Sequence, residues 1–305
     1  MMTVNYIDLL KNDNITFDII IPNEALHIIK NKYPYYKLLN FTSVFQKYVK
    51  GDKAGKVVHA DFAHLYYLAE IDFRLSQILM DLCLEIETHL KARLVYDADS
   101  VCNTKTLFKE YYNSDSEYLN KTYTVENIDV LKFGNASKSL CEMELSEFLN
   151  IAQFGTLERI IHFFYSKYST LLYESEYMSF EQYLGAVRRI RNLVAHNNSI
   201  IDKIPIKAEQ SNTKMTAFLG RYGIAHKTLI TNMSKPIIRD LCGLFFVYFK
   251  ANKCSENFLS NIKDFDTNYC QNYKKYFEKN DLLISSYRFM KEVIQIFVKN
   301  NSKSS

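Results

Sequence analysis

The stretch Asp61–Val95, DFAHLYYLAEIDFRLSQILMDLCLEIETHLKARLV, decides the fold of this chain. Aliphatic side chains recur along it at three- and four-residue spacing, which is the period of one face of an α-helix: Ile71, Leu75, Ile78, Leu79, Leu82 and Ile86. The polar residues from Asp97 to Asn103 interrupt the pattern. The stretch therefore predicts a long helix that ends near residue 97.

Turn-forming residues are scarce around this helix, with 8 Gly and 4 Pro in 305 residues. So few of them disfavour a β-sandwich or a doubly wound α/β fold, which need many tight turns. Further helical patterns run over 139–151, 157–168, 179–196, 235–250, 256–277 and 281–299. We therefore predict an all-α helical bundle with a mixed or helical N-terminal extension over 1–60, a helical domain over 61–299 and a frayed tail over 300–305.

Several classes of protein are disfavoured by the rest of the sequence. The longest apolar run, Leu241–Phe249, has nine residues, whereas a spanning helix needs about 20. The six cysteines form no CxxC pair, and the chain shows no signal peptide. They are typical of reduced thiols in a cytoplasmic protein. We expect no membrane contact, no cofactor and no metal, because His59 and His64 lack the intervening glutamate of a zinc protease.

The segment RNLVAH, Arg191–His196, lies at the end of the helix predicted over 179–196. Ser179 with Gln182 has capping-box spacing, and Asn197 suits the left-handed position that closes a helix. On an ideal helix Arg191 lies about 20° from Phe180, inside the apolar stripe. A guanidinium there needs an anionic partner, either a carboxylate from another helix or a substrate phosphate. Glu85 or Glu87 of the long helix is one possible carboxylate partner for Arg191.

The imidazole of His196 makes the segment a candidate for acid–base chemistry. Five residues from Arg191, it would point about 140° away on a regular helix, so the two converge only if the helix ends or distorts near Ala195. A purely structural alternative is that acids at the helix start and bases at its end complement the helix dipole. Those residues are Glu176, Glu181, Arg188, Arg189, Arg191 and His196.

Together with other blocks in the same order, this segment resembles the bacterial abortive-infection (Abi) family, whose helical domain belongs to the HEPN superfamily with an Arg-x4–6-His motif. Arg191–Asn197 is similar to the family's Arg-Asn-x-x-Ala-His. The blocks over 23–45 and 62–94, and Phe154-Gly155-Thr156-Leu157, resemble its N-terminal and central parts. Ser76 and Asn150 depart from the pattern, where an arginine and a carboxylate are expected.

The resemblance implies that the all-α bundle over 61–299 is HEPN-like. It also implies an RNA-directed protein of an antiphage or toxin–antitoxin-like system, with metal-independent endoribonuclease activity. In this interpretation His196 is the general acid or base, Arg191 stabilises the transition state and Asn192 orients the phosphate or the imidazole. The basic cluster formed by Arg188, Arg189 and Lys203 would hold the RNA backbone.

Other expectations concern partners. The RNA would be cellular, phage or small regulatory RNA, and the resemblance implies a homodimer in which two motifs face one cleft. Two alternatives remain: a non-catalytic RNA-binding protein of a phage-defence system, and a helical protein-interaction scaffold.

Overall fold

The computed structural model describes residues 5–124, 140–168, 181–208, 213–251 and 256–301. It confirms the predicted all-α class, because helices account for nearly all regular structure in these ranges. Two short strands, β1 (Ile15–Thr16) and β2 (Ala60–Asp61), pair in parallel with Ile15 opposite Ala60.

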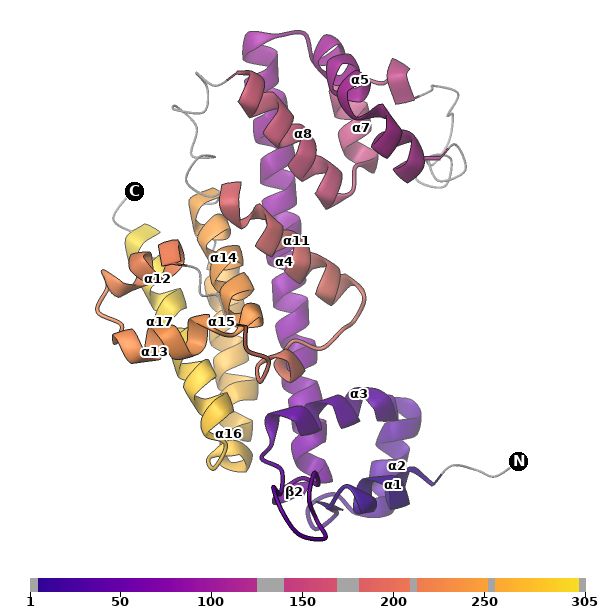
Figure 1. Cartoon of the computed structure of the whole chain (residues 1–305), viewed down its shortest axis with the longest axis vertical. Helices are drawn as coiled ribbons and strands as arrows, with labels where there is room; N and C mark the ends of the chain where they lie inside the picture. Colours follow the sequence, from indigo (N-terminus) through magenta and orange to yellow (C-terminus); the bar gives the residue numbers. More distant parts are fainter. Residues whose placement is uncertain (1–4, 125–139, 169–180, 209–212, 252–255, 302–305) are drawn as a thin grey trace.

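The long axis of the molecule is α4 (Phe62–Val101), which Figure 1 shows running between the two ends. Its 40 residues span about 60 Å at 1.5 Å per residue. The helix begins where predicted because Asp61 caps it: the Asp61 Oδ1 accepts from the Ala63 N–H at 2.9 Å, and the Asp61 N–H donates to Nδ1 of His64 at 2.9 Å.

The end of α4 lies beyond the predicted break, at Val101. Asp97 is buried within the helix, where its Oδ2 accepts from the Arg93 Nε at 2.9 Å and from the Tyr165 hydroxyl at 2.5 Å. A polar residue that finds both partners does not need to end the helix. The break predicted at residue 97 was therefore wrong by one turn.

Shorter elements gather at both ends of α4 (Figure 1). At its N-terminal end lie α1 (Tyr6–Asn12), α2 (Pro22–Asn31), α3 (Tyr35–Asn40) and the 3-10 turn η1 (Phe41–Val44). At its C-terminal end lie α5 (Thr104–Thr122), η2 (Leu140–Glu142), α7 (Leu145–Ile151) and α8 (Phe154–Lys167).

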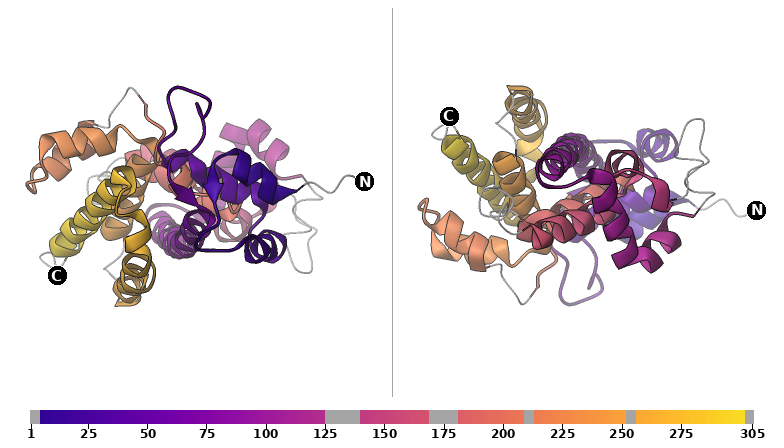
Figure 2. Two further views of the ribbon diagram at one scale, coloured as in Figure 1. Left: turned by 90° about the horizontal axis from the view of Figure 1, so that it is seen from below. Right: turned by 90° about the horizontal axis from the view of Figure 1, so that it is seen from above.

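The remaining elements follow in the chain, and the end-on views of Figure 2 show the C-terminal helices among them together on one flank of the molecule. They are η3 (Glu181–Tyr183), α11 (Leu184–Ala195), η4 (Ile201–Lys203), α12 (Thr213–Gly220), α13 (His226–Met233), α14 (Pro236–Ala251), α15 (Glu256–Phe265), η5 (Asp266–Gln271), α16 (Asn272–Phe277) and α17 (Asp281–Asn301). The single helix predicted over 256–277 is therefore two α-helices joined by a π-helical segment, η5.

Two hydrophobic clusters hold these elements together. The smaller joins α1–α3 to the first turns of α4 and also takes in Ile201 and Phe277. The larger contains the rest of α4 with α5, α7, α8, α11, α14 and α17. Among the residues that the structure describes, no helix combines the length and the apolar character needed to cross a membrane.

Candidate functional site

The Arg191–His196 segment lies on α11, which packs between α4 and α14. The helix is held close to α14, since a Cβ added to Gly243 would lie 2.9 Å from the Ala186 Cβ. Its apolar stripe is buried as the spacing predicted: Leu184, Val187, Ile190 and Val194. The helix begins at Leu184 after η3, and the start predicted at Ser179 lies outside the described residues.

The end of α11 has a specific closing geometry. Asn197 has φ +52°, its N–H donates to the Val194 carbonyl at 3.0 Å, and the Asn198 N–H donates to the Leu193 carbonyl at 3.0 Å. This pair of bonds is the Schellman arrangement, in which a left-handed residue stops the helix. The prediction that asparagine closes the helix here is confirmed.

A buried lysine from the N-terminal region fixes this closing residue. Lys37 on α3 is 6% exposed, and its Nζ donates to the Oδ1 of Asn197 at 2.8 Å and to its carbonyl at 3.3 Å. A cation at a helix C-terminus also complements the helix dipole. The residue directly after His196 is therefore anchored to a different part of the chain.

A buried carboxylate on α4 fixes the segment that follows. The Oδ1 of Asp72 accepts from the N–H groups of Ile200 and Ile201, at 2.8 Å each. Asp72 is completely buried. Burial raises the pKa of Asp72 to about 6, although its two backbone hydrogen bonds and the charge of Lys37 act in the opposite direction. Lys37 and Asp72 together form a two-point clamp on the chain from Asn197 to Ile201.

Sequence reasoning missed both residues of the clamp. Asp72 carried a signal, because it lies four residues after Leu68 and seven before Leu79 and therefore falls on the apolar face of its helix. The same argument had selected Arg191. Lys37 gave none, since it lies in an ordinary polar and aromatic stretch and its partner is 160 positions away.

Arg191 is half-buried and faces α4. Its Nε is buried and has no hydrogen-bond partner among the described residues. Burial raises the pKa of the neighbouring Cys83 thiol to about 12, and the positive charge of Arg191 opposes that rise. Two carboxylates proposed as partners are engaged elsewhere: Glu85 accepts from the Tyr248 hydroxyl at 3.0 Å, and Glu87 pairs with Lys91 at 2.8 Å.

His196 is exposed at the end of α11. Its backbone N–H donates to the Asn192 carbonyl at 3.2 Å, and its imidazole makes no hydrogen bond with any described residue. Because α11 stays helical through Ala195, Arg191 and His196 leave it about 140° apart. Within the described part of one chain, no hydrogen bond joins their side chains. The exposed side chain of Asn192 lies one turn before His196.

The three predicted RNA-binding cations each face a carboxylate. Arg188 Nη1 lies 3.1 Å from Oε2 of Glu158 on α8. Arg189 makes a two-bond contact with Asp240 on α14, at 2.8 and 2.6 Å. Lys203 pairs with its neighbour Asp202 at 3.0 Å. The two arginines therefore diverge toward different helices.

The match to a known family spans the clamp and the segment that it holds. A family model described as Abi-like protein matches residues 29–202, a range that includes Lys37, Asp72, Arg191 and His196. No curated protein and no solved structure matches the chain. Because the model covers more than half of the sequence, the chain belongs to the Abi-like protein family, and this membership supports a role in abortive infection, a form of phage defence.

Proposed function

We propose that this protein is an RNA-directed abortive-infection effector of the HEPN type, whose Arg191–His196 segment cleaves RNA without a metal ion. The observation that carries the proposal is the exposure and fixed position of His196. An exposed imidazole without a described hydrogen-bond partner stands at the end of a helix whose closing residue is clamped. Rigid placement of an accessible titratable group is what general acid–base catalysis requires.

The proposed reaction is a transesterification. His196 accepts the proton of a ribose 2′-OH, whose oxygen attacks the adjacent phosphorus, and the bond to the 5′-oxygen breaks as that oxygen gains a proton. The products are a 2′,3′-cyclic phosphate and a 5′-hydroxyl end. Histidine is the side chain that most often serves as general acid or base in such proton transfers. Arg191 supplies positive charge for the phosphorane-like transition state, and Asn192 orients the phosphate or the imidazole.

A homodimer would complete the site. In one chain Arg191 faces α4 while His196 is exposed at the end of α11, and one imidazole cannot be both base and acid in one step. Two copies with their motifs facing one cleft would supply two imidazoles.

RNA binding by Arg188, Arg189 and Lys203 requires each to exchange its carboxylate for a phosphate. The carboxylate partners are only 15%, 16% and 7% exposed, so the exchange leaves each of them largely buried without its cation. It therefore costs more than the roughly 0–1 kcal/mol of a fully exposed ion pair. The arginine side chains are 43% and 60% exposed, and the lysine is 38% exposed. Binding through such cations should weaken as salt concentration rises.

The test uses purified protein and labelled cellular RNA in excess chelator. We expect cleavage to persist and to leave 2′,3′-cyclic phosphate ends. His196→Ala should abolish cleavage while retaining RNA affinity, whereas the matched control His226→Ala, another exposed histidine, should cleave normally. Cleavage that His196→Ala retains, or that requires a metal ion, would contradict the proposal.

A second candidate is favoured by the divergence of Arg191 and His196: an RNA-binding protein of phage defence that does not cut. It predicts saturable RNA binding with no cleavage by the wild-type chain. The scaffold alternative predicts neither. Replacing Arg188 and Arg189 together by glutamate separates these alternatives, because only a scaffold should leave RNA retention unchanged.

A further inference from the structure

A cavity of about 430 Å³ lies between α4, η4, α14 and the C-terminal helices α15–α17. This volume falls in the roughly 300–1,000 Å³ range of small-molecule sites. Most of its walls come from beyond residue 202, where the family match ends. Aliphatic side chains dominate the lining, among them Ile71, Ile200, Ile204, Leu259 and Ile294. The body of an occupant must therefore be apolar.

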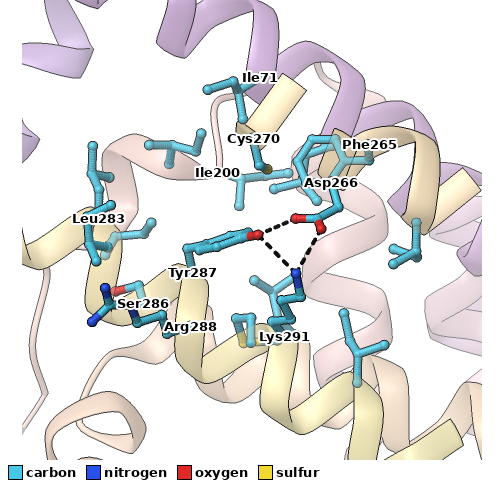
Figure 3. Close-up of a pocket in the computed structure, with 18 of the residues that line it drawn as sticks. Ile71, Ile200, Phe265, Asp266, Cys270, Leu283, Ser286, Tyr287, Arg288 and Lys291 are labelled. Carbon is cyan, nitrogen blue, oxygen red and sulfur yellow. Dashed lines mark hydrogen bonds and ion pairs between the residues drawn. The ribbon is translucent and has the colours of Figure 1, made fainter. Parts of the chain in front are cut away.

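Three polar side chains of the wall meet at one point: Figure 3 shows Asp266, Tyr287 and Lys291 together, with Ser286 and Arg288 on the other side of Tyr287. The Tyr287 hydroxyl donates to Oδ1 of Asp266, and the Lys291 Nζ donates to its Oδ2 at 2.8 Å. Gln271 adds a bond to the Tyr287 oxygen at 2.9 Å. Partial burial would raise the pKa of Asp266, but the hydrogen bonds from Lys291 and Tyr287 hold it below the ordinary value. Asp266 is the one carboxylate among the described residues of the wall, and its charge is neutralised by Lys291.

Three further cations of the wall are uncompensated. Lys263, Lys274 and Arg288 line the cavity, are exposed, and make no hydrogen bond or ion pair with any described residue. The described lining therefore combines mostly apolar side chains with three exposed cations that have no described partner. That combination complements an anionic head on an apolar body.

The π-helical segment η5 contributes residues to the cavity wall. Asp266 and Cys270 both lie in the π-helical segment and both line the cavity. Single π-turns within α-helices are uncommon and occur often at functional sites. In Figure 3 Asp266 and Cys270 approach Tyr287 from the same side.

From these observations we propose that the cavity binds an amphipathic anion with a single long aliphatic chain, such as a long-chain carboxylate. The aliphatic chain of this ligand lies against the aliphatic wall, and its carboxylate pairs with one of the exposed cations, Arg288, Lys263 or Lys274. The aliphatic chain of the ligand also contacts Ile200 and Ile201, which line the cavity and whose N–H groups donate to Asp72. Occupancy of the cavity therefore acts on the clamped segment that follows His196. An effect of the ligand on RNA cleavage rests on the proposed function, whereas binding of the ligand to the cavity is independent of it.

The experiment titrates laurate into the full chain by calorimetry and follows the amide hydrogen exchange of Ile200 and Ile201. We expect saturable binding of one laurate per chain, slower exchange at both amides, and weaker binding of octanoate. Replacing Lys263 and Arg288 together by glutamate should weaken binding about tenfold or more, because charge-assisted contacts are lost. The matched control Lys279→Glu, an exposed lysine outside the cavity wall, should bind as the wild type does.

Comparison ligands complete the test. Dodecyltrimethylammonium, with the same chain length and the opposite charge, should bind about tenfold more weakly than laurate. Equal affinity for the two amphiphiles, no saturable laurate binding, or full affinity in the double variant would overturn the proposal. Phosphatidylglycerol vesicles test the alternative source of the anion: sedimentation with vesicles but no laurate binding in solution would place the contact on a membrane surface and overturn the cavity site. These outcomes do not depend on nuclease activity.

Discussion

Lys37 and Asn197, 160 positions apart in the sequence, are joined by a 2.8 Å bond from the lysine Nζ to the amide Oδ1. The bond fixes the left-handed residue that ends α11 directly after His196. A helix end in solution ordinarily frays. Here a buried cation from α3 sets where the exposed imidazole stands, so the N-terminal region takes part in shaping the candidate site.

Asn197 tests this relationship, because its backbone and its side chain have separable roles. At φ +52°, alanine is strained by about 1–2 kcal/mol, whereas glycine is not. Both substitutions remove the Oδ1 that binds Lys37. We expect Asn197→Ala to lower the free energy of unfolding by about 1 kcal/mol more than Asn197→Gly in urea titrations. Both variants should reduce cleavage beyond the fraction unfolded, and equal stabilities would show that the left-handed conformation does not constrain this position.

Asp72 predicts a pH dependence of stability. Its folded pKa of about 6 lies above the ordinary value of about 3.9. Between these pH values the folded protein holds a proton that the unfolded chain has released. Stability from this group is therefore present at low pH and falls as pH rises from about 4 to 6. Lys37 and Asp202 are the charged neighbours that act on it.

Asp72→Asn keeps the Oδ1 acceptor and removes the titration. The difference in unfolding free energy between this variant and the wild type should grow by at most about 3 kcal/mol from pH 4 to pH 7. Asp72→Ala should instead cost about 2–4 kcal/mol, because two buried N–H groups lose their acceptor, and should speed amide exchange at Ile200 and Ile201. Asp99→Asn, at an exposed position of the same helix, is the control. Parallel pH profiles for Asp72→Asn and wild type would contradict the assignment.

Much of this architecture was predictable from local pattern. The start of α4, the buried stripe of α11 and the closing asparagine follow from periodicity and capping residues that lie within a few positions of one another. The clamp was not predictable in the same way, because Asp72 and Ile200 are 128 positions apart and no local rule pairs them. The π-helical segment inside the predicted 256–277 helix likewise leaves no signature in the apolar spacing.

In the candidate site too, features set by local sequence patterns were predictable, whereas those set by contacts between distant helices were not. Arg191 was predicted to lie inside the apolar stripe, and in the structure its side chain is half-buried rather than buried. The carboxylate partners of Arg188 and Arg189 come from α8 and α14, which the sequence alone does not place beside α11. The catalytic and RNA-binding roles of these residues stay predictions.

Arg191→Met separates stability from function. The arginine Nε is buried without a described partner, and such an atom costs about 1–3 kcal/mol. Methionine has a similar length and no polar atom. We expect the free energy of unfolding of the variant, measured by urea titration, to equal that of the wild type or to exceed it by up to about 1 kcal/mol. RNA cleavage should be lost. A large loss of stability would mean that the guanidinium stabilises the fold through a structural partner, and would argue against the proposal that it binds the RNA phosphate.

Gly243→Ala probes the contact that positions α11. The added Cβ would lie 2.9 Å from that of Ala186, and both are on packed helices, so neither can yield without moving a backbone. We expect a loss of about 1–3 kcal/mol in unfolding free energy, together with reduced cleavage because α11 carries His196. Gly220→Ala is the matched control: its Cβ would meet a Leu229 methyl at 3.6 Å, an ordinary contact, and the helical position favours alanine by up to about 1 kcal/mol. Equal effects of the two substitutions would show that the close approach of α11 and α14 does not determine where the motif lies.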